Sequence, residues 1–241
     1  MKRIFTLLSL VLFALSVLAA DGDVKKTTVD GIEWTYIVMS EENKTCQVGN
    51  SETGGDGTPF PAIDVNTTGA ITIPDSLDGY TVVSIGKGAF YNTAISSAVI
   101  PETVTEIGSE AFRSCENLVS VNIPKNVTSL GILTFGWCEK LEKITIPAAV
   151  TEMDNTTFRG CSGLTSITVE EGNSVFDSRD NCNAIIRSSS NTLVRGCINT
   201  IIPQSVTAIG PLAFYGCNTL TSITIPENIT SIGTSCFYGC I

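Results

Sequence analysis

The sequence predicts a repeat solenoid, right-handed and either α/β-type or β-rich, with a parallel sheet on one face and about seven turns of ~23 residues. Three observations predict it. An Ile–Pro pair recurs at a fixed spacing, apolar and polar residues alternate before each pair, and a Phe and a Cys follow at a constant distance. One such unit cannot bury its own apolar side, so the copies must stack to form a shared core.

The Ile–Pro pair sets the period of the repeat. Its proline lies at Pro101, Pro124 and Pro147, and again at Pro203 and Pro226, in steps of 23 residues. One more step from Pro147 reaches Glu170, which takes the place of the proline. The steps from Pro74 to Pro101 (27 residues) and from Glu170 to Pro203 (33 residues) are longer, so two turns carry extra chain.

Each unit has a strand followed by a turn. The segment L-x-x-I-x-I alternates as a half-buried strand does, and the proline that follows ends the strand because it has no amide donor. We expect the later Val, Ile and Phe to point inward from a bent or short helical segment. Stacked copies then place Leu on Leu, Ile on Ile and Phe on Phe.

The repeated residues carry a family resemblance. The segments LTSITIPENITSIG…CFYGC, at the end of the chain, and GYTVVSIGKGAF (residues 79–90) resemble the BspA-like leucine-rich repeats of bacterial secreted and surface proteins. The segment 175–210 is similar to an inserted hairpin in that family. The resemblance, over about residues 69–240, implies a leucine-rich-repeat fold and a role in adhesion to host matrix, other cells or cell-surface material. It implies no shared catalytic residues.

The chain divides into three expected parts. Residues 1–20 have a basic start and an apolar run that ends in small residues, as in a secretory signal peptide, so we expect a secreted or cell-surface protein. Residues 21–68 do not fit the repeat and should cap its first turn. Residues 69–241 should form the solenoid, with an uncapped C-terminal turn that suggests a fragment.

An inserted hairpin is expected at about residues 171–200. The apolar runs AII and TLV, joined by RSSSN, predict two strands that project from the solenoid. Such an insertion can belong to the binding surface or be a tolerated loop, and the sequence leaves both readings open. The acidic residues around it, Glu170, Glu171, Asp177 and Asp180, lack the spacing of a calcium loop and are read as solvated.

The composition excludes several classes of function. The formal net charge is −10, which disfavours nucleic acid and anionic membrane surfaces as partners, and no later segment predicts membrane insertion after signal cleavage. The chain has no His, the commonest general base and metal ligand. We therefore expect no enzyme, no metal site and no cofactor.

The outward strand positions give the candidate interaction face. They are polar, mostly Ser and Thr, and we expect them to bind a protein or glycan on a host matrix or neighbouring cells. Polar residues also simply solvate the open side of a sheet. The candidates are Ser120, Asn122, Glu142, Lys143, Thr145, Thr165, Ser166, Thr168, Thr221, Ser222 and Thr224.

Two other readings of this face stay open. The solenoid could be a structural spacer that displays another domain. The column formed by Thr72, Thr145, Thr168 and Thr224 also suggests a remote alternative, an ice-binding array, although Val99, Asn122 and Ile201 interrupt it.

The nine cysteines follow the repeat. Cys115, Cys138 and Cys161 are 23 residues apart, as are Cys217 and Cys240. This spacing predicts a column of small buried residues rather than disulfides. Cys182 and Cys197 flank the expected hairpin and are the best candidates for a disulfide.

Overall fold

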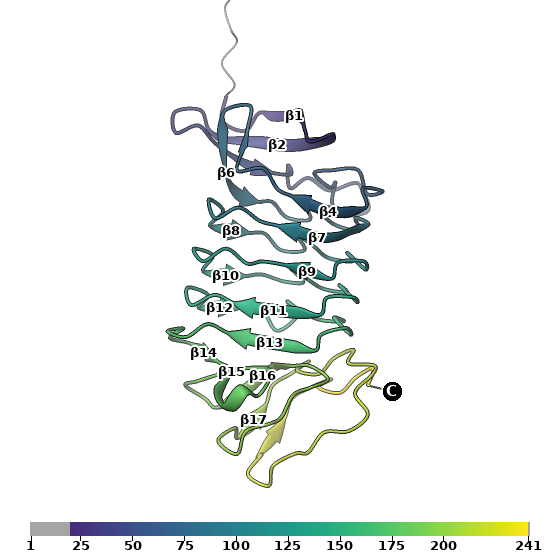
Figure 1. Cartoon of the computed structure of the whole chain (residues 1–241), viewed down its shortest axis with the longest axis vertical. Helices are drawn as coiled ribbons and strands as arrows, with labels where there is room; N and C mark the ends of the chain where they lie inside the picture. Colours follow the sequence, from purple (N-terminus) through teal and green to yellow (C-terminus); the bar gives the residue numbers. More distant parts are fainter. Residues whose placement is uncertain (1–19, 241) are drawn as a thin grey trace, which may run out of the picture.

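The computed structural model describes residues 20–240, and the expected signal peptide lies outside this range apart from its last residue. The chain coils into a β-solenoid of about 7 turns, each of ~23 residues, which confirms the predicted fold class. The turns lie one above the other along the long axis (Figure 1). Over the described residues, helical structure is confined to the 3₁₀ segment Arg179–Asn181, so the β-rich alternative holds and the expected helical segments are extended or turn-like. No described helix is long and apolar enough to cross a membrane.

The first strands form a small sheet above the first full turn. β1 (Val24–Val29), β2 (Ile32–Ser40) and β3 (Thr45–Val48) pair in antiparallel fashion. β3 then pairs in parallel with β6 (Tyr80–Ile85), which also contacts β5 (Ser76–Leu77) and β8 (Glu106–Ile107). The buried ring of Trp34 lies edge-on to Phe90, with 6.3 Å between centroids, so this sheet covers the apolar end of the stack.

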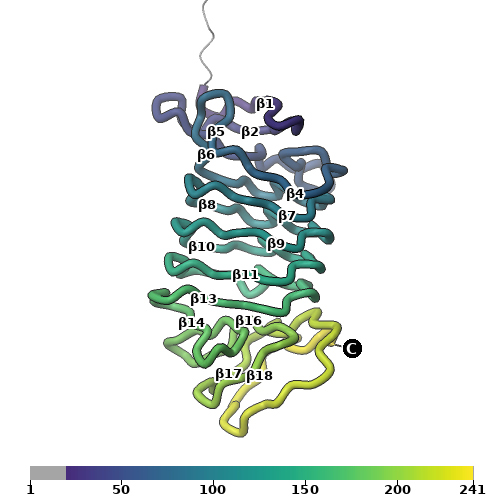
Figure 2. Tube along the Cα trace, viewed as in Figure 1, coloured from purple at the N-terminus to yellow at the C-terminus, as the bar shows by residue number. Residues whose placement is uncertain are grey.

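Two strand columns run along the solenoid (Figures 1 and 2). The strands that precede each Ile–Pro pair form what we call the strand face: β4 (Gly69–Thr72), β7 (Ile95–Val99), β9 (Ser120–Val121), β11 (Lys143–Ile146) and β13 (Ser166–Val169). The second column contains β6, β8, β10 (Ser129–Leu130) and β12 (Glu152–Met153). Within both columns the neighbouring strands that pair are parallel, as expected for stacked copies.

The repeated Phe residues form the centre of the core. Phe90, Phe112, Phe135 and Phe158 are fully buried and stack nearly parallel, with centroid separations of 4.8, 5.5 and 5.5 Å. This spacing matches the separation of neighbouring strands, so each turn adds one ring to the stack.

The cysteine column donates to backbone carbonyls, each of which also accepts a main-chain N–H from its own turn. The Sγ atoms of Cys115, Cys138 and Cys161 each donate to the carbonyl of the Phe in the preceding turn, at 3.0, 3.1 and 3.0 Å. A small residue with a weak donor therefore fits this position better than a purely apolar one.

After β13 the chain changes its path. β14 (Phe176–Asp177), β15 (Ala184–Arg187), β16 (Thr192–Gly196), β17 (Ala208–Ile209) and β18 (Ser231–Ile232) form one five-stranded sheet. β15 and β16 are an antiparallel hairpin, but β16 is almost entirely buried and pairs in parallel with β17. The hairpin is thus part of the stack and does not project from it, because its apolar strands fill the space beside the next turn.

Candidate functional site

The strand face gathers most of the predicted interaction residues. They lie next to one another on β9, β11 and β13, just after β9, and just before β11 and β13. Six are exposed: Ser120, Asn122, Glu142, Lys143, Thr145 and Thr168. Thr165 and Ser166 are half-buried.

The last three predicted residues do not join this surface. Thr221, Ser222 and Thr224 are exposed, but their segment forms no strand. The chain around residues 197–199 lies between them and β13, where Asn199 donates to Thr165 O at 3.1 Å and Ile198 N donates to Leu164 O at 3.4 Å. The strand face therefore ends at β13.

The hydrogen-bond ladder of the strand face is broken between β9 and β11. β9 ends a three-stranded sheet, and β11 begins a separate sheet with β13. The irregularity begins one turn earlier, where the residues after β7 meet those after β9. Ile73 N donates to Val99 O at 2.9 Å, whereas the equivalent Ile100 N donates to the Asn122 side chain, to Oδ1 at 2.7 Å.

The Asn122 side-chain amide makes the hydrogen bonds that the main chain of a paired strand would make to Ile100. Its Nδ2 donates to Ile100 O at 2.8 Å, which is the bond that Pro124 cannot make because it lacks an N–H. The side chain thus takes both main-chain groups of Ile100, and the main chain of Asn122 and Ile123 makes no hydrogen bond to either neighbouring turn.

Ile123 is left with unpaired main-chain groups. Its side chain is buried, yet no hydrogen bond within residues 20–240 uses its N–H or its carbonyl. The next turn cannot supply a donor for the carbonyl because Pro147 has no N–H. Where Glu170 takes the place of proline, by contrast, Glu170 N donates to Ile146 O at 2.9 Å. Ile123 is 8% exposed as a whole residue, so its unpaired main-chain groups mark a local gap in the ladder rather than an open sheet edge.

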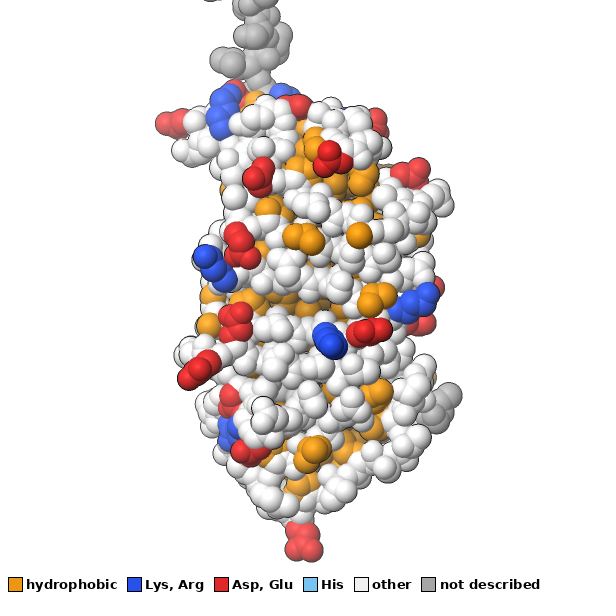
Figure 3. Space-filling model, in the orientation of Figure 1, with side chains coloured by type: hydrophobic (Ala, Val, Ile, Leu, Met, Phe, Trp, Pro, Cys, Tyr) orange, Lys and Arg blue, Asp and Glu red, His pale blue; other side chains and the backbone are white. Residues whose placement is uncertain are grey.

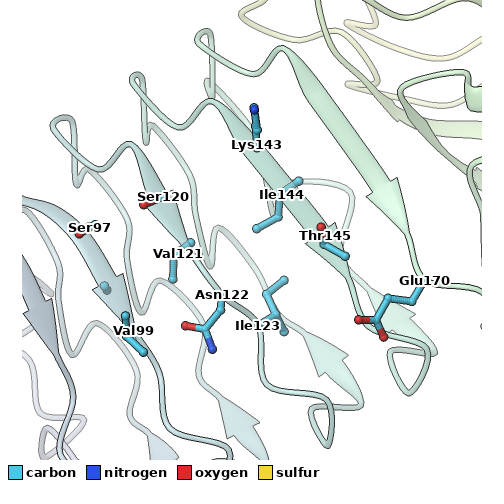
Figure 4. Close-up of a pocket in the computed structure, with 11 residues that line it drawn as sticks. Ser97, Val99, Ser120, Val121, Asn122, Ile123, Lys143, Ile144, Thr145 and Glu170 are labelled. Carbon is cyan, nitrogen blue, oxygen red and sulfur yellow. The ribbon is translucent and has the colours of Figure 1, made fainter.

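A groove of about 540 Å³ lies over the break. Val121 and Ile144 belong to its apolar lining, and Ser120, Asn122, Lys143 and Thr145 belong to its polar lining (Figure 4). Hydrophobic side chains come to the surface at mid-height on this side of the molecule (Figure 3). The groove therefore combines apolar contact area with polar groups that can orient a partner.

The groove holds one charge of each sign. Lys143 is exposed and forms no ion pair with any residue of the described range. Glu170, at another part of the groove, accepts a hydrogen bond from Ala148 N at 3.0 Å (Figure 4). Lys143 is thus the available cation of the groove.

Sequence reasoning assigned four of the eleven residues that line this groove to the interaction face. It identified Ser120, Asn122, Lys143 and Thr145 as outward-facing residues. It noted Val99 only as an interruption of the threonine column, and it missed Val121, Ile123 and the role of Asn122 as a ladder breaker. The pairing of an outward Asn with Pro124 and Pro147 was the available signal.

The threonine column is short. Thr145 and Thr168 are in contact, with 3.3 Å between their Oγ1 atoms. Asn122 and Val99 occupy the next two positions towards the N-terminus, and Thr224 lies outside the sheet. A regular threonine array thus spans two turns.

Eight of the nine cysteines are buried and Cys240 is half-buried. Cys182 Sγ donates to Ala184 O at 3.7 Å and Cys197 Sγ donates to Asn183 O at 3.3 Å, so each has its own carbonyl partner. Burial raises the pKa of Cys182 to about 11 and that of Cys161 to about 12, which keeps these thiols protonated and unreactive. A disulfide between Cys182 and Cys197 stays a prediction.

No cluster of potential metal ligands occurs in the described part of the chain.

The acidic residues of the insertion include one structural ion pair. Arg179 donates from Nε to Asp177 Oδ1 at 2.7 Å and from Nη2 to Asp177 Oδ2 at 2.5 Å, and Ser188 Oγ donates to Oδ2 at 2.6 Å. Burial raises the pKa of Asp177, but the hydrogen bonds from Arg179 and Ser188 outweigh it and the net pKa is lowered. Asp177 therefore ties the hairpin to its neighbouring segment.

Comparison with known proteins places these repeats in a family. A sequence profile of the BspA-type leucine-rich repeat region matches six copies, over residues 83–193 and 196–241. The chain belongs to the BspA-type leucine-rich repeat family. The match describes a repeat and indicates no catalytic family. No curated protein sequence matches the chain.

Solved structures show the same fold. A leucine-rich repeat protein from Eubacterium ventriosum is 19% identical, with a TM-score of 0.55, and the match covers 90% of this chain and 64% of that protein. The leucine-rich repeat protein of T. pallidum is 20% identical, with a TM-score of 0.52 and coverages of 90% and 89%. The pneumococcal vaccine antigen PcpA is 18% identical, with a TM-score of 0.50 and coverages of 92% and 69%.

Proposed function

We propose that this protein is a secreted or cell-surface binding protein of the adhesin type, and that the strand face binds a protein or glycan of a host matrix or a neighbouring cell. The observation that carries the proposal is the groove over the ladder break, where apolar side chains, polar side chains and Lys143 lie together. Membership in the BspA-type family supports a surface location, as does the fold shared with a pneumococcal vaccine antigen. A rigid repeat scaffold holds such a surface without an ordering cost on binding.

Binding of the mature protein, from Asp21, to a panel of immobilised matrix proteins and glycans tests this proposal. The variant Lys143→Glu/Thr145→Glu changes the groove. The matched control Lys87→Glu/Thr151→Glu makes the same substitutions at exposed positions off the strand face. We expect saturable binding that falls at least about tenfold in the groove variant, a loss of about 1.4 kcal/mol, and that stays within about twofold in the control.

Other outcomes identify other functions. Equal binding by all three proteins would move the site to the hairpin or the cap. No binding by any of them, with folding shown by circular dichroism, would favour a structural spacer.

A further inference from the structure

The strand face has an unpaired edge at its N-terminal end. β4 is an outer strand of the three-stranded sheet β4–β7–β9, and it is the uppermost strand of the strand face in Figure 1. One turn earlier the chain forms the β2–β3 hairpin instead, and β3 pairs with β6 in the second column. No strand of the described chain pairs with the outer edge of β4.

The pairing with β7 shows which main-chain groups of β4 are free. Ile73 N donates to Val99 O at 2.9 Å, so the main chain of Ile73 faces β7. Successive residues of a paired strand direct their N–H and C=O groups to opposite edges. The groups of Ala70 and Thr72 therefore face the outer edge, where no hydrogen bond of the described chain uses them. Both residues are exposed, so this edge lies at the surface.

The side chains along this edge leave room for another strand. Gly69, Ala70 and Thr72 are small, and β4 contains neither Lys nor Pro, two residues that commonly protect an edge strand. A hollow of about 430 Å³ lies beside the C-terminal end of β4 and includes Thr72 and Val29 in its lining. A second hollow, of about 570 Å³, lies near its N-terminal end, next to Thr67.

The charges at this edge are acidic at one end. Asp30 and Asp75 line the hollow at the C-terminal end of β4, both are exposed, and neither forms an ion pair within the described chain. In the second hollow, Lys26 and Glu33 pair with each other at 2.7 Å. Two carboxylates without a cation favour a partner that carries Lys or Arg. Residues 45–86 contain no Lys and no Arg, so the same edge of a second copy cannot supply this charge.

We propose that the outer edge of β4 binds an extended polypeptide segment of another protein, with a Lys or Arg of that segment beside Asp30 and Asp75. The addition of a strand to a free sheet edge is a common mode of peptide recognition, in which main-chain hydrogen bonds supply the affinity. The four residues of β4 span roughly 13 Å, the length of about four residues of the added strand. This site is separate from β9 and β11 and does not depend on the function proposed for the groove there.

The probe is the synthetic peptide GAITIKK with both ends blocked. It copies residues 69–73 and carries two Lys in place of Pro74 and Asp75. These residues form the strand that precedes β7 in the ladder, so the peptide should pair with β4 as β4 pairs with β7. Its second Ile N–H would then donate to Thr72 O, as Ile73 N donates to Val99 O. We expect saturable binding by calorimetry.

Two N-methylated forms of the peptide test the main-chain pairing. The first has N-methyl groups on its two Ile residues, which removes the donors that face β4. The second has them on its Ala and Thr, whose N–H groups face away from β4. Both forms keep every side chain and both charges. We expect an affinity at least tenfold lower for the first form and within about twofold of the unmodified peptide for the second.

Variants of the chain test the same edge from the other side. Thr72→Pro removes an outer-edge N–H that the described chain does not use, and an edge strand tolerates Pro at such a position. We expect at least a tenfold loss of affinity. Asp30→Asn/Asp75→Asn should lose at least threefold, and Asn suits the positive φ of residue 30. The matched control Glu116→Gln/Glu139→Gln makes the same change of charge at exposed positions away from β4 and should bind as the parent does.

Four results would overturn the inference. They are no saturable binding of GAITIKK, equal affinities of the two N-methylated forms, full binding by a folded Thr72→Pro variant, and a parent that dimerises through an edge that Thr72→Pro blocks. The N-methylated pair needs no variant, so it decides the matter even if Thr72→Pro fails to fold. The Lys143→Glu/Thr145→Glu variant should bind GAITIKK as the parent does. If GAITIKK fails to bind but that variant loses its matrix partner, the proposed function stands and this inference falls.

Discussion

The turns before Glu170 and those after it repeat the same sequence pattern but stack differently. Before Glu170, the strand face extends from β4 to β13 with one break, and four Phe rings stack without interruption. After it, the strand face has no further strand and only the column β16–β17–β18 continues. Phe214 and Phe237 form a separate stacked pair, 5.2 Å apart.

The inserted hairpin explains the difference. The segment Val194–Cys197 occupies the position of the Phe-x-Gly-Cys motif, so Val194 stands where the other turns have a Phe ring. The neighbouring Arg195 is buried and has no acidic partner in the described structure. Outside the core, Arg159 connects the two regions, with its guanidinium 4.2 Å from the Tyr215 ring centroid and Nη2 donating to Tyr215 Oη at 2.8 Å. The edge of the solenoid thus stays continuous while its core and strand face are interrupted.

The largest expected contrast between the regions is in the Phe stacks. Phe135→Ala leaves a cavity between two stacked rings and should lower the free energy of unfolding by about 3–5 kcal/mol. Phe237→Ala removes a half-buried ring with one stacked neighbour and should cost about 1 kcal/mol. Urea denaturation followed by circular dichroism measures both values. Equal losses would show that the two stacks are equally packed.

The cysteine column should show a smaller contrast of the same kind. Cys138→Ala removes one of two donors to the Phe112 carbonyl, which keeps its bond from Cys115 N, and should lower the stability by about 0.5–1.5 kcal/mol. Cys138→Ser keeps a donor and should recover part of the loss. Cys240→Ala, at a half-buried site, should cost less than Cys138→Ala in the same urea titration. A Ser variant no better than the Ala variant would assign the column to packing alone.

Arg195 is expected to weaken the boundary between the regions. Its Nη1 donates to Leu212 O at 3.4 Å and Tyr215 O at 3.2 Å, and its buried Nε has no partner. Arg195→Met removes a buried charge and keeps much of the side-chain volume, so it should raise the stability by about 1 kcal/mol. A fall in the thermal midpoint would show instead that the carbonyl bonds outweigh the burial of the charge.

The hairpin ion pair gives the smallest effect, and it depends on pH. Because the pKa of Asp177 is lowered in the folded state, its stabilisation is present above the unfolded-state pKa and is lost as pH falls through the folded-state pKa. Asp177→Asn should therefore cost up to about 1 kcal/mol at pH 7, and the difference from the parent should close below about pH 4. Denaturation midpoints of the two proteins from pH 7 to pH 3 measure this, and a constant difference would contradict it.

The sequence predicts the periodic part of the molecule well, because the repeat itself determines which side chains stack. It does not predict that Leu220–Ile225 lacks a strand, although this segment closely resembles Leu141–Ile146. A strand needs a paired neighbour, and the chain that follows the hairpin lies between this segment and β13, which would otherwise be its neighbour. Similarly, Asn122 looks like a solvated polar residue until the partners of Ile100 are known. The outward residues of the candidate site were therefore predictable and the break between β9 and β11 was not.

Amide hydrogen exchange, resolved by residue with NMR, tests the central claim about the strand face most directly. The amides of Ile73 and Ile100 are hydrogen-bonded, to Val99 O and to Asn122 Oδ1, and that of Ile123 is not. We expect strong protection at Ile73 and Ile100 and exchange at least about 100-fold faster at Ile123, a difference of roughly 2.7 kcal/mol in opening free energy. Equal protection at the three positions would mean that the ladder is continuous, and the binding groove proposed at the break would have no basis.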